Sequence, residues 1–277
     1  AVSDQPQHQV MAFVGGGTMA EALMARLLAG ERFGAEQVRV GEPLAERRDA
    51  LQQQYGVLTY ADNREAVRSV SLVVLAVKPQ VLDGVLDGLR GAIAEGALVL
   101  SIVAGVTIDR IVAALGVEAV VRAMPNTPGQ VGEGATVWTA TPATSDAQRG
   151  LAREVLGALG LEIEVAQERY LDMATALSGS GPAYVFLFIE ALVEAGVRLG
   201  FARPVAEQLA LQTVRGSAAY AQQAGISAAD LRARVTSPGG TTAEALYQLE
   251  KGGLRAAVLD AVQAAYHRAQ EPGRANS

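Results

Sequence analysis

Two glycine-rich stretches in this chain have the composition of loops that bind anions. The first is GGGTMA at residues 15–20, between an apolar run at residues 10–14 and a helical pattern that begins at Thr18. A strand, a G-x-G-x-x-A turn and a helix in this order can hold the pyrophosphate of a dinucleotide at the helix N-terminus. Because the same glycines can also serve only to pack a helix against a strand, the order of the elements favours binding without proving it.

The second stretch is VTSPGGTTAEAL at residues 235–246, in a part of the chain with helical patterns. Thr241 and Glu244 have the spacing of a capping box, in which a hydroxyl and a carboxylate satisfy N–H groups at a helix end. Alternatively, the backbone N–H groups of this loop hold the carboxylate of a substrate. Since the first turn already accounts for a pyrophosphate, we expect the second stretch to be that carboxylate site.

Charged residues beyond the first turn bear on which dinucleotide is bound. Glu42 follows the second predicted strand, roughly 20 residues beyond the turn. Its carboxylate would accept hydrogen bonds from a ribose diol and repel a 2′-phosphate, which favours NAD over NADP. Arg47 and Arg48 follow in the next predicted helix, and either could bind that phosphate. The sequence therefore leaves both NADP(H) and NAD(H) open as cofactors. Lys78, at the end of an apolar run, is either a further contact or a solvated charge.

The residue types that are missing narrow the chemistry further. The chain has no cysteine, its two histidines are His8 and His267, and its lysines are Lys78 and Lys251. Oxidation of a hydroxyl group usually needs a histidine or lysine as general base, and none is available in the middle of the chain. Reduction of a carbon–nitrogen double bond is less demanding, because an imine nitrogen takes a proton from water or a weak donor. The sequence therefore favours imine reduction, with a carboxylate clamp and a well-placed hydroxyl group.

The elements that must position these groups form two patterns. Short apolar runs predict strands at 10–14, 37–40, 72–77, 98–103, 119–123, 135–139 and 162–165, with helices between them at 18–28, 44–54, 79–91, 107–115 and 145–159. This alternation predicts an α/β fold with an N-terminal Rossmann-type, doubly wound, mostly parallel sheet in residues 1–165.

Residues 166–277 show helical patterns alone, at 168–177, 182–199, 204–223, 228–234, 242–250 and 255–270, and we expect an all-helical substrate and dimerisation domain. Pro182 and Pro204 suit the first turns of their helices. The 182–199 helix is apolar on nearly every side, so we expect a second copy of the chain to cover it.

Composition excludes several classes of partner. The net charge of −6 argues against nucleic acid and anionic membranes as partners, and we expect no metal site. The first ten residues do not resemble a signal peptide. The apolar run 183–193 falls short of the roughly 20 residues that a membrane span needs. We therefore expect a soluble cytoplasmic protein.

Several motifs together resemble those of the pyrroline-5-carboxylate reductases, which make proline by reducing a cyclic imine with a nicotinamide cofactor. They are AVKP at 76–79, SIVAGVTI at 101–108, MPNTP at 124–128, SGSGPAY at 178–184 and SPGGTT at 237–242. The resemblance runs from about residue 10 to 270. It implies a Rossmann domain and a helical domain that forms a homodimer, often assembled into larger rings of dimers. It also implies that the substrate is a small cyclic imine carboxylate.

The same resemblance assigns roles to individual residues. Implied cofactor contacts are Val14, Gly15, Gly16, Gly17, Thr18, Met19, Glu42, Asn63, Ala76, Val77, Lys78, Pro79, Val103 and Gly105. Implied substrate contacts are Asn126, Ser178, Gly179, Ser180, Ser237, Gly239, Gly240, Thr241 and Thr242. Thr242 is the implied catalytic residue, with its hydroxyl beside the imine nitrogen. Glu42 departs from the Ser, Asn or Arg type of group that is typical of the family, so NADH use is a second hypothesis.

Two other functions are compatible with the architecture. A hydroxyacid dehydrogenase of this kind would need a catalytic lysine in the 182–199 helix, which contains none. A non-catalytic nucleotide-sensing protein could keep every glycine of the fold. Turnover of pyrroline-5-carboxylate would distinguish the reductase from this binding protein.

Overall fold

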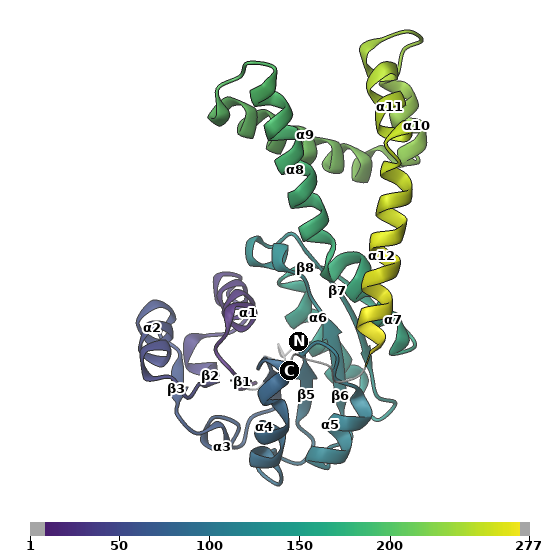
Figure 1. The fold of residues 1–277 in the computed structure, drawn as a ribbon. Helices are drawn as coiled ribbons and strands as arrows, with labels where there is room; N and C mark the ends of the chain where they lie inside the picture. The colour runs from purple at the N-terminus through teal and green to yellow at the C-terminus, as the bar shows by residue number, and fades with distance from the viewer. Residues whose placement is uncertain (1–8, 272–277) are drawn as a thin grey trace, which may run out of the picture. The chain divides into compact units, whose positions relative to one another are not determined.

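A computed structural model describes residues 9–271, and its first compact unit is built on an eight-stranded sheet (Figure 1). The strand order is β3-β2-β1-β4-β5-β6-β7-β8. The bounds are β1 Met11–Val14, β2 Val38–Gly41, β3 Leu58–Tyr60, β4 Leu72–Leu75, β5 Leu98–Ser101, β6 Val120–Met124, β7 Gly134–Ala140 and β8 Gly160–Glu164. Neighbouring strands are parallel except β6 and β7, which are antiparallel. The first six strands follow the Rossmann order, so the predicted fold class is confirmed.

Among the described residues, six α-helices and three 3-10 turns lie between these strands, and a seventh helix and a π-helical turn follow β8. The helices are α1 Thr18–Ala29, α2 Ala45–Tyr55, α3 Asn63–Ala66, α4 Leu82–Leu89, α5 Ile108–Leu115, α6 Asp146–Gly157 and α7 Arg169–Ala174. The 3-10 turns are Ala35–Gln37, Pro79–Val81 and Thr127–Val131, and a π-helical turn spans Thr175–Gly179. The sequence prediction missed β3 and α3. Both elements are too short to show a hydrophobic period. Helix α3 also depends on a local cap, in which the Asp62 carboxylate accepts a hydrogen bond from the Arg64 N–H at 2.8 Å.

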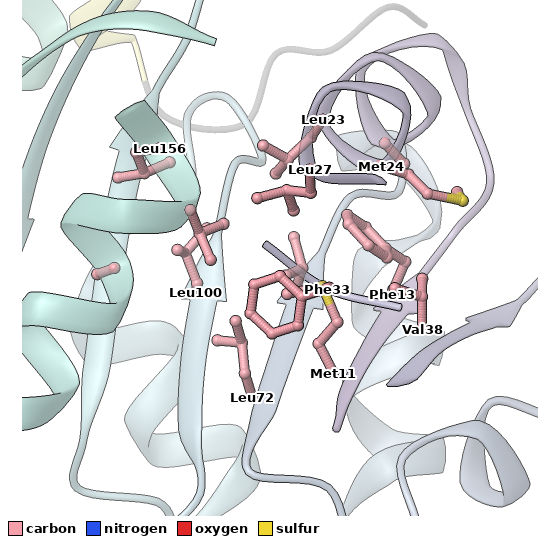
Figure 2. Packing of buried hydrophobic residues seen from close by; sticks show 14 of the residues in the cluster. Met11, Phe13, Leu23, Met24, Leu27, Phe33, Val38, Leu72, Leu100 and Leu156 are labelled. Atoms are coloured by element: carbon pink, nitrogen blue, oxygen red, sulfur yellow. The ribbon is translucent and has the colours of Figure 1, made fainter. Parts of the chain in front are cut away.

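The continuous apolar strands are explained by burial on both faces of the sheet. In β1, Met11 and Phe13 enter one hydrophobic cluster, while Ala12 and Val14 enter the other. Successive side chains of a strand point to opposite faces, so a strand between two helical layers needs apolar residues throughout. Figure 2 shows the first cluster, in which residues from β1, β4 and β5 lie beside residues from α1 and α6. This packing holds the carboxyl ends of the strands in place.

The second compact unit is helical and comprises Ser180–Ala265, while residues 266–271 group with the first unit. Its helices are α8 Gly181–Arg198, α9 Arg203–Ala224, α10 Ala228–Arg234, α11 Thr241–Lys251 and α12 Leu254–Gln270, the last running past the unit's end. Prolines lie in the first turns of α8 and α9, as predicted. The last strand, β8, ends at Glu164, next to the predicted domain boundary at 165/166, whereas the compact units divide after Gly179.

Helix α8 exposes a large apolar surface in the single chain. Val193 is its one buried residue, and Phe186 and Leu187 are 62% and 68% exposed. Together with α7 and the π-helical turn, α8 forms a helical run at Arg169–Leu199 that could cross a membrane by length and composition. The expectation that the apolar run is too short for a span is therefore wrong, because the helix continues well beyond 183–193.

Candidate cofactor and substrate sites

The first glycine turn lies at the point in the sheet where the strand order reverses. Strand β1 pairs with β2 on one side and β4 on the other. The Gly15 N–H donates to the Gly41 carbonyl at 2.8 Å, and the Ala76 N–H donates to the Val14 carbonyl at 2.9 Å. The turn, Glu42 after β2 and residues 76–79 after β4 therefore meet at one carboxyl edge. This is where open α/β sheets bind their ligands.

The glycines of this turn are needed for different physical reasons. Gly15 has φ of +98°, and a Cβ added there would lie 2.9 Å from both the Ala76 carbonyl oxygen and Val77 Cγ1. Gly17 has ordinary dihedral angles, and a Cβ added there would meet no atom of the chain within 4 Å. Burial also changes at this point, because Gly15 and Gly16 are buried while Gly17 and Thr18 are exposed. Helix α1 then starts at Thr18 without a side-chain cap. Open space in front of uncapped N–H groups fits a pyrophosphate.

Glu42 does not present a free carboxylate, because both of its oxygens accept hydrogen bonds from the backbone. Oε2 accepts from the Gly16 N–H and Oε1 from the Leu44 N–H, each at 3.0 Å, and the residue is 9% exposed. Arg48 donates through Nη1 to the Glu42 and Pro43 carbonyls, both at 2.8 Å. The glycine turn and the loop after β2 are thus held together by charged side chains. Contact between Glu42 and a ribose stays a prediction.

Arg47 connects the turn to two further residues. Its Nε donates to the Gly16 carbonyl at 2.7 Å, and its Nη2 lies 2.5 Å from Glu21 Oε2. The Tyr55 hydroxyl donates to Glu21 Oε1 at 3.0 Å. The hydrogen bond from Arg47 holds the pKa of Glu21 below its ordinary value, and burial raises the pKa of Tyr55. The ionised form of Glu21 is therefore favoured in the folded protein.

We predict that this ion pair makes a pH-dependent contribution to stability. A carboxyl group whose pKa is lowered on folding stabilises the folded state above its unfolded value of about 4.3 and loses that effect as the pH falls through the folded pKa. The difference in Tm between the wild-type protein and Glu21→Gln should therefore be constant near neutral pH. It should shrink below about pH 4.3. Thermal unfolding of both proteins across this range tests it, and a difference that persists in acid would contradict the assignment.

The remaining implied cofactor residues also follow strands at this edge. Asn63 begins α3, and its Oδ1 is buried without a hydrogen-bond partner among the described residues. That oxygen packs against Gly41, where an added Cβ would lie 2.2 Å from it, so position 41 has no room for a side chain. Lys78 is exposed after β4. Val103 is buried in the core after β5, so that any contact it makes uses its backbone, and Gly105 has φ of +71°.

Asn126 links the MPNTP and SGSG motifs directly. Its Nδ2 donates to the Ser178 carbonyl at 2.9 Å, and its Oδ1 accepts from the Ala135 N–H at 2.8 Å. Ser178 and Gly179 end the π-helical turn, where a Cβ on Gly179 would lie 2.9 Å from Met124 Cε. Such turns recur at functional sites. The structure therefore brings these three implied substrate residues together, whereas Ser180 is the first residue of the second unit.

Sequence analysis missed a buried charge network beside this turn. Arg122 in β6 is 5% exposed at its side chain and pairs with Glu168 at 2.7 Å and Asp172 at 3.6 Å. Glu168 also accepts from the N–H of Ile108 at 2.8 Å. The signal was an arginine within the apolar run VVRAM, since a charge in a buried strand needs partners. The network anchors α7, and hence the π-helical turn, to the sheet.

The SPGGTT stretch joins α10 to α11 in the second unit. Gly239 has φ of +65°, and the Gly240 N–H donates to the Ser237 carbonyl at 3.0 Å, which closes the turn. Gly240 is the N-cap residue, and its helix has no side-chain cap. The alternative of a capping box is therefore wrong, because Thr241 is already the first helical residue and not the residue before it. Thr242 is half-buried in the same first turn.

Among residues 9–271, no group of three or more His, Asp or Glu side chains could hold a metal ion.

Known proteins match both parts of the chain. The family described as "NADP oxidoreductase coenzyme F420-dependent" matches residues 10–105, and the family "Pyrroline-5-carboxylate reductase dimerisation" matches residues 168–272. The first match covers the glycine turn and the strands on either side of it. The second covers the SPGGTT stretch and the exposed helix α8.

Similarity to individual proteins extends over nearly the whole chain. A pyrroline-5-carboxylate reductase of Synechocystis is 46% identical over 95% of this chain and 98% of that protein. The solved structure of the Coxiella burnetii enzyme has a TM-score of 0.89 and 40% identity, covering 95% of this chain and 98% of that one. A Plasmodium falciparum pyrroline carboxylate reductase with NADP bound has a TM-score of 0.86 and 31% identity, covering 95% and 97% of the two chains. With the cofactor turn, the MPNTP and SGSG contacts and the SPGGTT loop all present in one chain of matching length, this protein belongs to the pyrroline-5-carboxylate reductase family.

Proposed function

We propose that this protein reduces L-1-pyrroline-5-carboxylate to L-proline with NADP(H), the last step of proline biosynthesis. The observation that carries the proposal is a 46% identical pyrroline-5-carboxylate reductase matched over nearly its full length. The open glycine turn and the absence of an alcohol-oxidising base agree with imine reduction. Reductase activity therefore explains both the open glycine turn and the lack of a histidine or lysine base in the middle of the chain.

The residues at the carboxyl edge of the sheet fit a dinucleotide. The N–H groups of Gly17, Thr18 and Met19 would hold the pyrophosphate at the start of α1. Asn63, residues 76–79, Val103 and Gly105 would line the rest of the cofactor site. Bound NADPH supplies the hydride that reduces the carbon–nitrogen double bond. The P. falciparum relative was solved with NADP, which supports NADP(H) as the cofactor here. Use of NADH as a second cofactor stays a prediction.

The SPGGTT loop would bind the substrate. The Gly240 N–H is already used within the turn, so the N–H groups of Gly239, Thr241 and Thr242 are the donors left for a carboxylate at this helix N-terminus. The Thr242 hydroxyl would hydrogen-bond the ring nitrogen and pass it a proton from water. Asn126, Ser178 and Gly179 would shape the wall near the reacting carbon, with Ser180 beside them in sequence.

Association of two chains accounts for the apolar surface of α8. The dimerisation family covers residues 168–272, which include the membrane-length helical run. We infer a cytoplasmic homodimer in which residues 166–277 are the substrate and dimerisation domain. Dimers assemble further into a ring, without nucleic acid or membrane partners. Sedimentation velocity of the purified protein tests this assembly, and a stable monomer would contradict it.

The proposed reaction is tested by following the loss of the NADPH absorbance when pyrroline-5-carboxylate is added to the enzyme. Substrate-dependent oxidation of NADPH and formation of proline are expected. A protein that binds NADPH without turnover would instead be the non-catalytic nucleotide sensor.

Cofactor preference gives a further prediction. Because the oxygens of Glu42 already accept two N–H groups, their repulsion of a 2′-phosphate is weakened, and we expect NADPH to be preferred over NADH. Arg48 lies in the first turn of α2, where it contacts the loop that holds Glu42, and would bind that phosphate. Arg48→Gln should lower kcat/KM for NADPH roughly tenfold while leaving NADH unchanged, since the hydrogen bond it removes is to a charged group. Steady-state kinetics with both cofactors measure this, and an equal loss for both would remove Arg48 from phosphate recognition.

A further inference from the structure

The peptide groups on both sides of Gly16 are held by side chains of opposite charge. The Gly16 N–H donates to the Glu42 carboxylate at 3.0 Å, and the Gly16 carbonyl accepts from Arg47 Nε at 2.7 Å. Glu42 follows β2 and Arg47 lies in α2, so both come from outside the turn. Neither residue type is required to build a strand–turn–helix unit. Because both side chains hold the backbone of Gly16, their role concerns the conformation of the turn itself.

Three consecutive glycines make this turn unusually free. Glycine adopts positive and negative φ with similar ease, so the peptide planes within Gly15–Gly17 can rotate at little steric cost. Rotation of the Gly16–Gly17 peptide would turn a carbonyl oxygen toward the space in front of Gly17. A carbonyl there would repel the pyrophosphate that the site is proposed to bind. A turn of this composition therefore benefits from an external restraint.

Arg47 provides that restraint by selecting one orientation. In a trans peptide the carbonyl and the next N–H point in opposite directions. With the Gly16 oxygen held by Arg47, the Gly17 N–H points to the other side of the peptide. Resting on the proposed dinucleotide binding, we propose that Arg47 is a positioning residue which orients the Gly16–Gly17 peptide for the cofactor pyrophosphate. Arg47 acts through Gly16 and does not contact the 2′-phosphate.

Arg47 is itself held in place by a second set of contacts. Its Nη2 pairs with Glu21 of α1, and the side chains of this pair are only 31% and 25% exposed. The other Glu21 oxygen accepts from Tyr55, which also accepts from Gln54 Nε2 at 2.9 Å. The guanidinium thus uses separate nitrogens for the turn and for Glu21. A lysine could keep the charge but not both directed contacts.

Binding measurements with two cofactors test the proposal directly. Affinities of the free enzyme for NADPH and NADH would be measured by calorimetry for wild type, Arg47→Gln, Arg47→Lys and Glu21→Gln. Arg47→Gln should weaken both cofactors by the same factor, roughly tenfold or about 1.4 kcal/mol. Arg47→Lys should recover only part of this, and Glu21→Gln should show a smaller loss of the same kind. Hydrogen exchange in residues 13–23 of the cofactor-free enzyme should become faster in Arg47→Gln.

Controls separate the possible outcomes. Arg32→Gln removes another Arg–Glu pair, Arg32–Glu154 at 3.1 Å, and should change neither affinity. A loss for NADPH alone in Arg47→Gln would overturn the proposal and make Arg47 a phosphate ligand. Unchanged affinities for both cofactors would also overturn it. If Arg47→Gln does not fold, Glu21→Gln and Arg47→Lys decide the question. The quantities compared are again the ratios of variant to wild-type affinity for NADPH and for NADH. Failure of the wild-type protein to bind either cofactor would instead contradict the proposed function.

Discussion

Replacing Thr242 with alanine should lower kcat for pyrroline-5-carboxylate by roughly two to three orders of magnitude, the loss typical of one preorganised transition-state donor. Thr242 lies in the first turn of α11, directly after the Gly239–Gly240 turn. Its hydroxyl is the proposed hydrogen-bond partner of the ring nitrogen. That nitrogen carries a proton and a positive charge when the hydride arrives. The chain has no histidine or lysine in this loop to take over that role.

Two companion variants make the Thr242 result specific. Thr242→Ser keeps the hydroxyl and should keep most of kcat. Thr236→Ala removes a nearby hydroxyl that donates to the Arg232 carbonyl at 2.6 Å, and activity should not change. The affinity for NADPH should be unaltered in all three variants, because neither Thr242 nor Thr236 belongs to the proposed cofactor site. A Thr242→Ala enzyme with wild-type kcat would exclude this hydroxyl from the mechanism.

Alanine at Gly15 and alanine at Gly17 should both abolish efficient use of the cofactor, but for different reasons. Gly15→Ala forces a Cβ to within 2.9 Å of the Ala76 carbonyl in a backbone region that favours glycine, so the fold itself should be destabilised. Gly17→Ala meets no atom of the protein within 4 Å and has an allowed conformation. Its methyl group would occupy space that the pyrophosphate needs.

The two glycine variants are distinguished by combining unfolding with binding. Gly17→Ala should keep the wild-type Tm while the KM for NADPH rises roughly a hundredfold, the effect expected from displacing a bound group by about 1 Å. Gly15→Ala should lower Tm as well as cofactor affinity. A Gly17→Ala enzyme with unchanged KM would show that the space before α1 does not receive the pyrophosphate.

Much of the fold could be predicted from sequence because its signals are local. The seven predicted strands correspond to seven of the eight observed. The clearest signals came from β1, β4 and β5, whose apolar runs are buried throughout. The missing strand, β3, has three residues and lies at the sheet edge, where no such pattern is required. The starts of α8 and α9, each one residue before its proline, followed from the fixed geometry of Pro182 and Pro204. The Thr241 capping box failed because helix starts shift by single residues with the geometry of the preceding turn.

The sequence by itself indicated which residues could do chemistry, because types and spacing along the chain are local properties. Residue types and spacing pointed to the glycine turn and Glu42, and the resemblance to a known family pointed to the MPNTP and SGSG motifs and Thr242. Only the tertiary structure decided what several of them contact. Glu42 turns to the Gly16 and Leu44 N–H groups, Arg47 holds the Gly16 carbonyl, and Asn126 reaches Ser178. These partners are separated by up to 52 residues in the chain. Hydrogen bonds depend on direction and on a distance of about 3 Å, and only the packing of sheet and helices brings such distant groups within that reach.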